Sequence, residues 1–239
     1  MKMKLIGTVI AGTALLVVQA QAQNLIQNGS FESLLVPGVK VSSGFGGGGV
    51  PGWDGPVAGD TGVDVGTSIK APGAQNGVNA AYFHNQDGWA QQTGSAALGG
   101  NPVITSGQNY DLSFWTMNID TYQPWGSAGL GVISVELYYG SPGNDIYSEV
   151  DFNLGLSSNG ATPGTWVAQN LMIPSTDIPV AAIGQDIGLR IWNSSSAPNG
   201  GSWIYVDSVN LQAVPEPSTI ALLGFGALGG LLALRRRHA

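Results

Sequence analysis

The sequence predicts an all-β fold, an antiparallel β-sandwich or jelly roll, with an apolar segment at each end of the chain. Three observations predict it. Short runs alternate between apolar and polar residues with a period of two, as strands with one buried face do. Each run ends at Gly, Pro or Asn residues that favour turns. Outside the chain ends no long run repeats with the helical period of about 3.6 residues, so packed antiparallel sheets are the simplest architecture.

The first 22 residues have the three parts of a secretory signal peptide. Lys2 and Lys4 precede an apolar stretch from Leu5 to Val18, and Ala20-Gln21-Ala22 supplies the small residues of a cleavage site. Cleavage after this site would make Gln23 the mature N-terminus. A retained membrane helix is the alternative, but the apolar stretch is short and ends in a cleavage site.

Residues 23–213 are predicted to form a single domain, because 191 residues can bury a substantial core. Alternation identifies four of its strands, and turn-forming residues such as 140–144 and 197–200 separate them. The predicted apolar faces are Tyr110, Leu112 and Phe114; Ile133, Val135, Leu137 and Tyr139; Val167, Leu171 and Ile173, interrupted by Gln169; and Ile187, Leu189 and Ile191.

The last 26 residues, 214–239, combine a rigid turn, an apolar helix and a basic end. Pro215 and Pro217 fix their backbone angles, so the helix begins after them, with Ser218 as its N-cap. From Ile220 to Leu234 the helix is 15 residues long, about 22 Å, which is short for a bilayer core of roughly 30 Å. Arg235, Arg236 and Arg237 keep this end in the cytoplasm. A short span with a rigid junction suits a segment that is recognised and cut.

The run Val214-Pro215-Glu216-Pro217-Ser218-Thr219, followed by Ala221-Leu222-Leu223-Gly224 and Arg235-Arg236-Arg237, resembles the PEP-CTERM sorting signal of Gram-negative bacteria. The resemblance implies export across the inner membrane and processing near the Pro-Glu-Pro turn by an exosortase. The mature protein would then lie at the cell surface or outside the cell, in an organism that makes extracellular polysaccharide. An ordinary C-terminal membrane anchor is the alternative, but it does not require Pro-Glu-Pro at its entrance.

The predicted mature domain is strongly acidic. It holds three basic residues, Lys40, Lys70 and Arg190, against fourteen acidic ones, a net charge of −11. This charge excludes nucleic acid as a partner, because a phosphate backbone needs a basic surface, and favours neutral sugars or cations. The chain has no cysteine, so the exported fold must be held without disulfides, either by its core alone or by its core together with a metal.

The ends of the mature domain carry a second resemblance. Three segments are similar to parts of galactose-binding-like jelly rolls, a family that includes many carbohydrate-binding modules. They are Asn24 to Glu32, Pro51-Gly52-Trp53, and Ile204 to Leu211. The resemblance implies a β-sandwich whose first and last strands lie side by side, often with a structural calcium ion.

A calcium ion also follows from the expected position of Asp207. Asp207 has the same strand parity as Val209 and Leu211, so its carboxylate is expected to point toward the interior or its rim, where an unpaired charge is costly. Calcium binds carboxylates and carbonyl oxygens, and the resemblance makes Glu32, Asp207 and the carbonyl of Gly29 candidate ligands. Asp64 is a further candidate. In the alternative, Asp207 only caps nearby backbone N–H groups.

Binding of a sugar requires exposed aromatic rings, on which pyranose rings stack, with hydrogen-bonding groups beside them. Trp115 lies on the opposite strand face from Tyr110 and Phe114. Trp192 shares a strand face with Arg190. Trp115, Arg190 and Trp192 are therefore the candidate sugar-binding residues.

Nothing in the domain predicts catalysis. His84 is its one histidine, and its surroundings lack the pattern of a nucleophile elbow. A glycosidase would need two carboxylates at a set distance. With fourteen acidic residues some pair can always be chosen, so the sequence gives no evidence for such a site. The domain is predicted not to be an enzyme.

Two functions remain open. One is a noncatalytic surface or extracellular protein that binds extracellular polysaccharide. The other is a structural or adhesive protein of the biofilm matrix that acts through contacts with other proteins. A sorting signal joined to a domain that resembles carbohydrate-binding modules favours the first.

Overall fold

A computed structural model describes residues 24–39, 41–42, 45, 49–55, 61–66, 69, 73–84, 89–93, 102–118, 131–141, 145–153, 164–194 and 203–215. The predicted signal peptide and the predicted membrane helix lie outside these residues. Within them, no helix is both long enough and apolar enough to cross a membrane.

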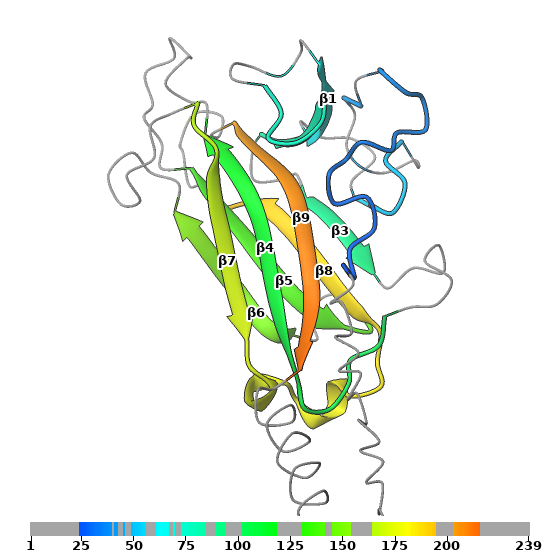
Figure 1. The fold of residues 1–239 in the computed structure, drawn as a ribbon, viewed down its shortest axis with the longest axis vertical. Coiled ribbons are helices and arrows are strands. Elements are labelled where there is room, and N and C mark those ends of the chain that lie inside the picture. The colour runs from blue at the N-terminus through cyan, green and yellow to red at the C-terminus, as the bar shows by residue number, and fades with distance from the viewer. Residues whose placement is uncertain are drawn as a thin grey trace, which may run out of the picture.

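The described chain forms two antiparallel sheets that lie face to face (Figure 1). One sheet has five strands in the order β1-β2-β9-β4-β7, and the other has four in the order β3-β8-β5-β6. This arrangement confirms the predicted all-β antiparallel sandwich. The strands are β1 Thr61–Val65, β2 Asn79–Phe83, β3 Trp89–Thr93, β4 Gln108–Asn118, β5 Val132–Tyr139, β6 Asp145–Asn153, β7 Val167–Ile173, β8 Ile187–Asn193 and β9 Ile204–Pro215, with short 3₁₀ helices η5 Ser175–Asp177 and η6 Val180–Ala182.

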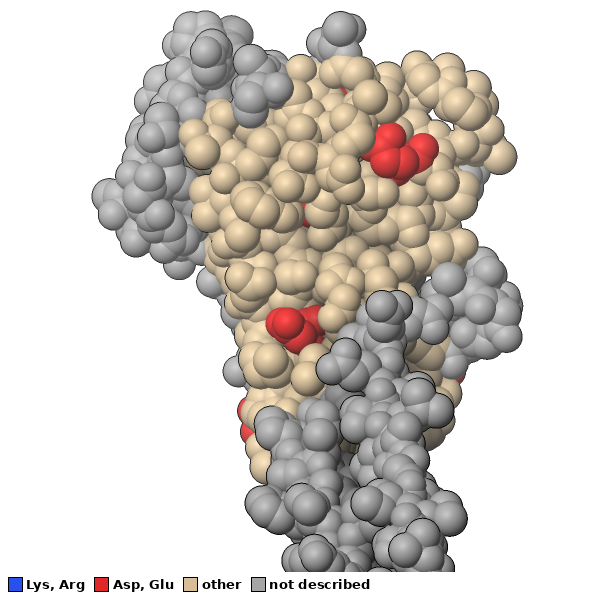
Figure 2. Space-filling view, in the orientation of Figure 1, with Lys and Arg blue, Asp and Glu red and all other residues tan. Residues whose placement is uncertain are grey.

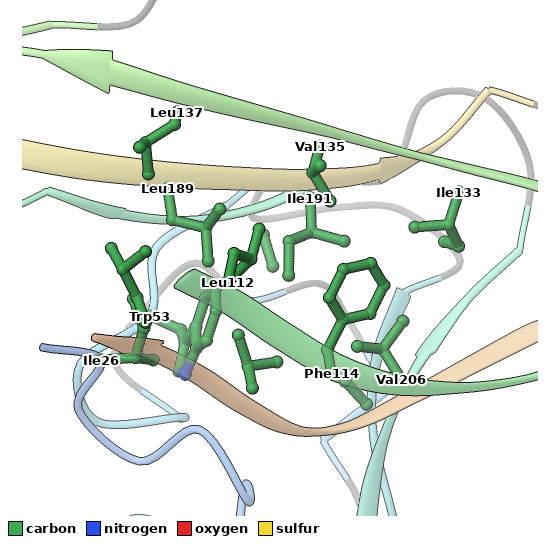
Figure 3. Packing of buried hydrophobic residues seen from close by; sticks show 14 of the residues in the cluster. Ile26, Trp53, Leu112, Phe114, Ile133, Val135, Leu137, Leu189, Ile191 and Val206 are labelled. Carbon is green, nitrogen blue, oxygen red and sulfur yellow. The ribbon is translucent and has the colours of Figure 1, made fainter. Parts of the chain in front are cut away.

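The four predicted apolar faces are confirmed in β4, β5, β7 and β8. Apart from the half-buried Val167, their residues belong to or pack against one core that also contains Ile26, Trp53 and Val206 (Figure 3). The polar interruption in β7, Gln169, also points inward, where its Nε2 donates to the Thr116 hydroxyl at 3.0 Å. The core can hold this amide because its hydrogen bond is made inside the sandwich.

The N-terminal segment lies beside β9 as predicted, but it is not a strand. Asn24 pairs with Gln212 only as an isolated bridge, and the Leu25 N–H donates to the Leu211 carbonyl at 2.7 Å. Asn28 and Phe31 then adopt left-handed backbone angles, with φ of 50° and 57°, which end extended structure. The first strand that the resemblance implied here was wrong, because the turn at Asn28-Gly29 ends extended structure after only a few residues.

The expected orientation of Asp207 was also wrong, because β9 contains a bulge. Between the pairs Ser113–Asn210 and Trp115–Asp207, β9 advances by one residue more than β4, and Ser208 takes a φ of 53°. Val206 and Val209 therefore both face the core, whereas Asp207 shares the outer face with Tyr205. Asp207 is nevertheless fully buried, under the segment that precedes β2.

Candidate functional site

The outer face of the five-stranded sheet carries two carboxylates that hold one loop; we call Glu32, Asp207 and residues 75–79 the carboxylate site. Asp207 Oδ2 accepts hydrogen bonds from the N–H groups of Gln75 at 3.1 Å and Asn76 at 2.9 Å. Its Oδ1 accepts one from the Ser208 N–H at 2.6 Å. The bulge at Ser208 is what directs this backbone N–H at the carboxylate.

Glu32 binds the other end of the same loop. Its Oε1 accepts hydrogen bonds from the N–H groups of Val78 at 2.9 Å and Asn79 at 2.8 Å. The Asn79 side chain in turn donates to the Phe31 carbonyl at 3.1 Å. The N-terminal segment, the loop and β9 are therefore joined through two acidic side chains.

The charge on Asp207 is only partly compensated by these contacts. The pKa of Asp207 is raised from 3.8 to about 7, chiefly by burial, with the backbone hydrogen bonds lowering it and the negative charge of Glu32 adding a smaller increase. The capping that was considered as an alternative to calcium is therefore present. It leaves a site that still favours added positive charge, either a proton or a cation.

The other predicted calcium ligands lie around this site. The Gly29 carbonyl accepts a hydrogen bond from the Val209 N–H at 2.8 Å, two residues beyond Asp207. Asp64 lies on β1, on the far side of β2 from β9, and its Oδ2 accepts a hydrogen bond from the Tyr205 hydroxyl at 2.6 Å. Glu32 and Asp207 share a loop, whereas Asp64 faces a tyrosine.

The donor set of the carboxylate site suits a hard cation. Two carboxylates and nearby carbonyls are the oxygen ligands that calcium takes, whereas zinc prefers nitrogen and sulfur. Among the described residues, no group of three or more His, Cys, Asp or Glu side chains could hold a metal. Carbonyl oxygens would have to complete a calcium shell.

Several residues of this site carry no sequence signal. Gln75, Asn76 and Val78 act through backbone N–H groups, which any residue except proline supplies. The Asn28-Gly29 turn does have a signal, because this pair favours left-handed backbone. Its Asn28 carbonyl accepts a hydrogen bond from the Trp53 indole N–H at 3.1 Å, which brings Pro51-Gly52-Trp53 to the N-terminal segment.

The outer face of the four-stranded sheet holds a second candidate site, the aromatic face, defined by Ser134, Glu136 and Tyr138 of β5 and Gly188, Arg190 and Trp192 of β8. The register sets them in three opposed pairs, Ser134–Trp192, Glu136–Arg190 and Tyr138–Gly188. The Arg190 guanidinium lies 5.3 Å from the centre of the Trp192 ring and 3.9 Å from the Glu136 carboxylate. Arg190 and Trp192 are half-buried, while Glu136 and Tyr138 are buried.

The three predicted sugar-binding residues do not form one platform. Arg190 and Trp192 lie together on the four-stranded sheet, whereas Trp115 lies on the outer face of the five-stranded sheet, paired in register with Asp207. The two sheets of the sandwich lie between them, so Trp115 cannot belong to the same sugar site as Arg190 and Trp192. Glu136 and Tyr138 are additions that the sequence analysis missed, although their alternation with Val135 and Leu137 placed them on this face.

Replacing Gly188 with alanine is expected to disturb the aromatic face. An added methyl group would meet the ring and hydroxyl of Tyr138, which is fully buried. We expect a loss of about 1–3 kcal/mol in the free energy of unfolding, as for other overpacked sites. Denaturant titration measures it.

The partner mutation provides the control for this contact. When Gly188→Ala is combined with Tyr138→Ala, the clash is absent. The double mutant should therefore lose less free energy of unfolding than the two single mutants lose together. Strictly additive losses would contradict the contact.

The His84 side chain, which showed no catalytic pattern in the sequence, makes an aromatic contact in the structure. The His84 ring lies 4.6 Å from the Trp203 ring, which stacks on Tyr82 at 5.6 Å. These residues cover a second, smaller apolar cluster on the outer face of the five-stranded sheet.

Comparison with known proteins identifies the C-terminal segment. Residues 213–237 match the PEP-CTERM protein-sorting motif. This match confirms the sorting signal that the sequence analysis recognised. The motif indicates a secreted, exosortase-sorted protein that is extracellular or at the cell surface. No curated protein matches the chain.

Solved structures show the fold of the domain. A cyclase from Fischerella sp. TAU, in complex with 4-(1H-indol-3-yl)butan-2-one, is 20% identical with a TM-score of 0.55, covering 80% of this chain and 96% of that chain. A CBM22-1 xylan-binding domain from Paenibacillus barcinonensis is 13% identical with a TM-score of 0.43, covering 81% and 96%. The non-crystalline cellulose-specific module CBM28 is 14% identical with a TM-score of 0.43, covering 73% and 95%. At 20% identity, the likeness to the cyclase shows a shared fold alone.

Fold and motif together define a class of protein. The chain is an exported β-sandwich protein with a PEP-CTERM sorting signal.

Proposed function

We propose that this protein is a noncatalytic binder of neutral extracellular polysaccharide. In this proposal the chain consists of a signal peptide at 1–22, a galactose-binding-like jelly roll at 23–213 and a sorting segment at 214–239. An exosortase of a Gram-negative bacterium removes the sorting segment. The observation that carries the proposal is the aromatic face. There a tryptophan ring, a guanidinium and a carboxylate lie side by side on one sheet.

The chemistry of this face fits a sugar. The Trp192 ring offers a surface for the C–H groups of a pyranose, and Arg190 and Glu136 offer hydrogen-bond donors and acceptors to hydroxyl groups. Because Arg190 is held between Glu136 and Trp192, its side chain loses little conformational entropy on binding. The net charge of −11 on residues 23–213 would repel polyanions, which favours neutral chains.

Trp192→Ala is expected to weaken binding to the polysaccharide of the host about tenfold or more, because a stacked ring contributes about 1 kcal/mol or more beyond its buried area. Affinity electrophoresis or a glycan array measures it. Trp115→Ala removes an equally large ring from the other sheet and should leave binding unchanged. Loss of binding only with Trp115→Ala would move the site to the five-stranded sheet.

One observation favours the alternative, a matrix protein that acts through protein contacts. The outer face of the five-stranded sheet carries a row of amide and hydroxyl groups, in which Asn210 donates to Ser113 at 3.5 Å and Gln212 donates to Asn210 at 3.4 Å. Such a flat polar surface can associate with a second copy. Self-association of purified residues 23–213 without glycan binding would favour this function.

We also propose that the carboxylate site binds a structural calcium ion. Glu32, Asp207 and the Gly29 carbonyl would hold it, with Asp64 as an outer candidate. The ion would neutralise the two acidic side chains that attach the N-terminal segment and the loop to β9. It would stabilise the fold and take no part in a reaction.

A further inference from the structure

Both ends of the described chain meet at one end of the sandwich, which we call the proximal end. Asn24 is bridged to Gln212, and β9 continues to Pro215, which pairs with Gln108 of β4. In Figure 1 the orange end of β9 lies beside the yellow turns η5 and η6. The proximal end is defined here as residues 102–109 and 174–187.

Hydrogen bonds fix these segments to one another. The Ser175 N–H donates to Asn109 Oδ1 at 2.7 Å. The Ile104 N–H donates to the Gln185 carbonyl at 2.9 Å, and the Gly184 N–H donates to the Ile104 carbonyl at 2.8 Å. The surface is therefore a rigid part of the sandwich, continuous with the point from which the sorting segment leaves.

The connection to the sorting segment is very short. Pro215 is still in the ladder, and the apolar run begins at Ile220, so only residues 216–219 separate them. Fully extended, this connection spans less than about 20 Å. The headgroup layer of one leaflet is itself about 6 Å thick. When the apolar run is in a bilayer, the proximal end must lie close to the headgroups.

The proximal end exposes aliphatic side chains. Val180 is 85% exposed, Val103 50% and Ile183 40%. Val180 and Ile183 belong to one turn, in which the Ile183 N–H donates to the Val180 carbonyl at 3.2 Å. Transfer of such exposed aliphatic side chains from water to an apolar environment is favourable.

Charge argues against attraction to anionic headgroups. Arg190 is the one Lys or Arg within the described ranges, and it lies on the aromatic face. Where the described surface is visible in Figure 2, it shows acidic patches and no basic one. Contact with lipid would therefore occur through shallow insertion of aliphatic side chains into a zwitterionic surface.

We propose that the proximal end rests on the outer surface of the bilayer until the sorting segment is cut, with Val103, Val180 and Ile183 at the boundary between headgroups and acyl chains. This inference rests on the proposed sorting function, because it needs the C-terminal segment to be inserted. It places the Pro-Glu-Pro turn at the membrane surface. Asp207 is eight residues back along β9, about 25 Å from Pro215 along the strand.

The test uses the full chain in phosphatidylcholine vesicles. Because the chain has no cysteine, single cysteines can carry an environment-sensitive fluorophore. Val180→Cys reports on the proximal end. Val78→Cys, at a site 59% exposed beside Glu32, is the matched control, and Ala227→Cys reports insertion of the C-terminal segment. Nitroxide-labelled lipids quench fluorophores that contact the bilayer.

We expect strong quenching at position 227 and at least about twofold stronger quenching at 180 than at 78. Quenching at 227 with equal values at 180 and 78 would overturn the docking inference and leave the sorting function intact. Absence of quenching at 227 would overturn membrane insertion, and docking with it. Quenching at 180 that requires added exosortase would assign the surface to the enzyme and overturn the assignment to lipid.

Discussion

Gly29→Ala is expected to lower the free energy of unfolding by about 3 kcal/mol. Gly29 is buried where the N-terminal segment crosses β9, and a Cβ added there would overlap the Val209 carbonyl oxygen. Backbone atoms cannot move aside as a flexible side chain can. The segment would have to leave β9, which costs overpacking strain and the 2.8 Å hydrogen bond from Val209 to Gly29.

Chemical denaturation of residues 23–213 measures this loss. Gly38→Ala makes the same chemical change in open space, at a φ of 74°, so it should cost only the left-handed backbone strain of about 1 kcal/mol. Equal losses for the two variants would show that the crossing at Val209 is not a tight contact. A shift of the transition midpoint at constant slope would identify the effect as stability.

Alternation of apolar and polar residues predicted β4, β5, β7 and β8 and missed β2, whose two faces are both apolar. β4 and β8 alternate because one face meets the core and the other does not. β2, Asn79–Phe83, is buried at every position, because its outer face lies under the smaller apolar cluster. Its sequence, NAAYF, therefore carries no period of two, and the strand was not predicted.

The candidate sites show the same limit. Alternation gives the face of a residue within its own strand, but it does not say which sheet the strand joins. Trp115 and Trp192 were therefore both assigned to outer faces correctly, and only the topology separates them. The bulge at Ser208 could not be predicted, since a serine at a φ of 53° has no sequence signature, and it reverses the orientation of Asp207.

Without calcium, the domain is expected to lose stability as the pH rises from about 4 to 7. The pKa of Asp207 is raised from 3.8 to about 7, chiefly by burial, so over this range the folded state holds a proton that the unfolded state has released. The contribution is fully present below pH 3.8 and is lost as the pH rises through the folded-state pKa. A shift of this size corresponds to about 4 kcal/mol. Thermal melts across the pH range in chelator measure it.

Calcium should reverse this trend, because the ion replaces the proton. At pH 7.5 we expect it to raise the melting temperature by about 5–10 °C, a gain that disappears on acidification as protons compete for Asp207. Asp207→Asn should abolish both the calcium response and the pH slope. Asp177→Asn, which removes an exposed acid from η5, should leave both unchanged. A pH slope that calcium does not alter would mean that the two carboxylates serve only as backbone caps.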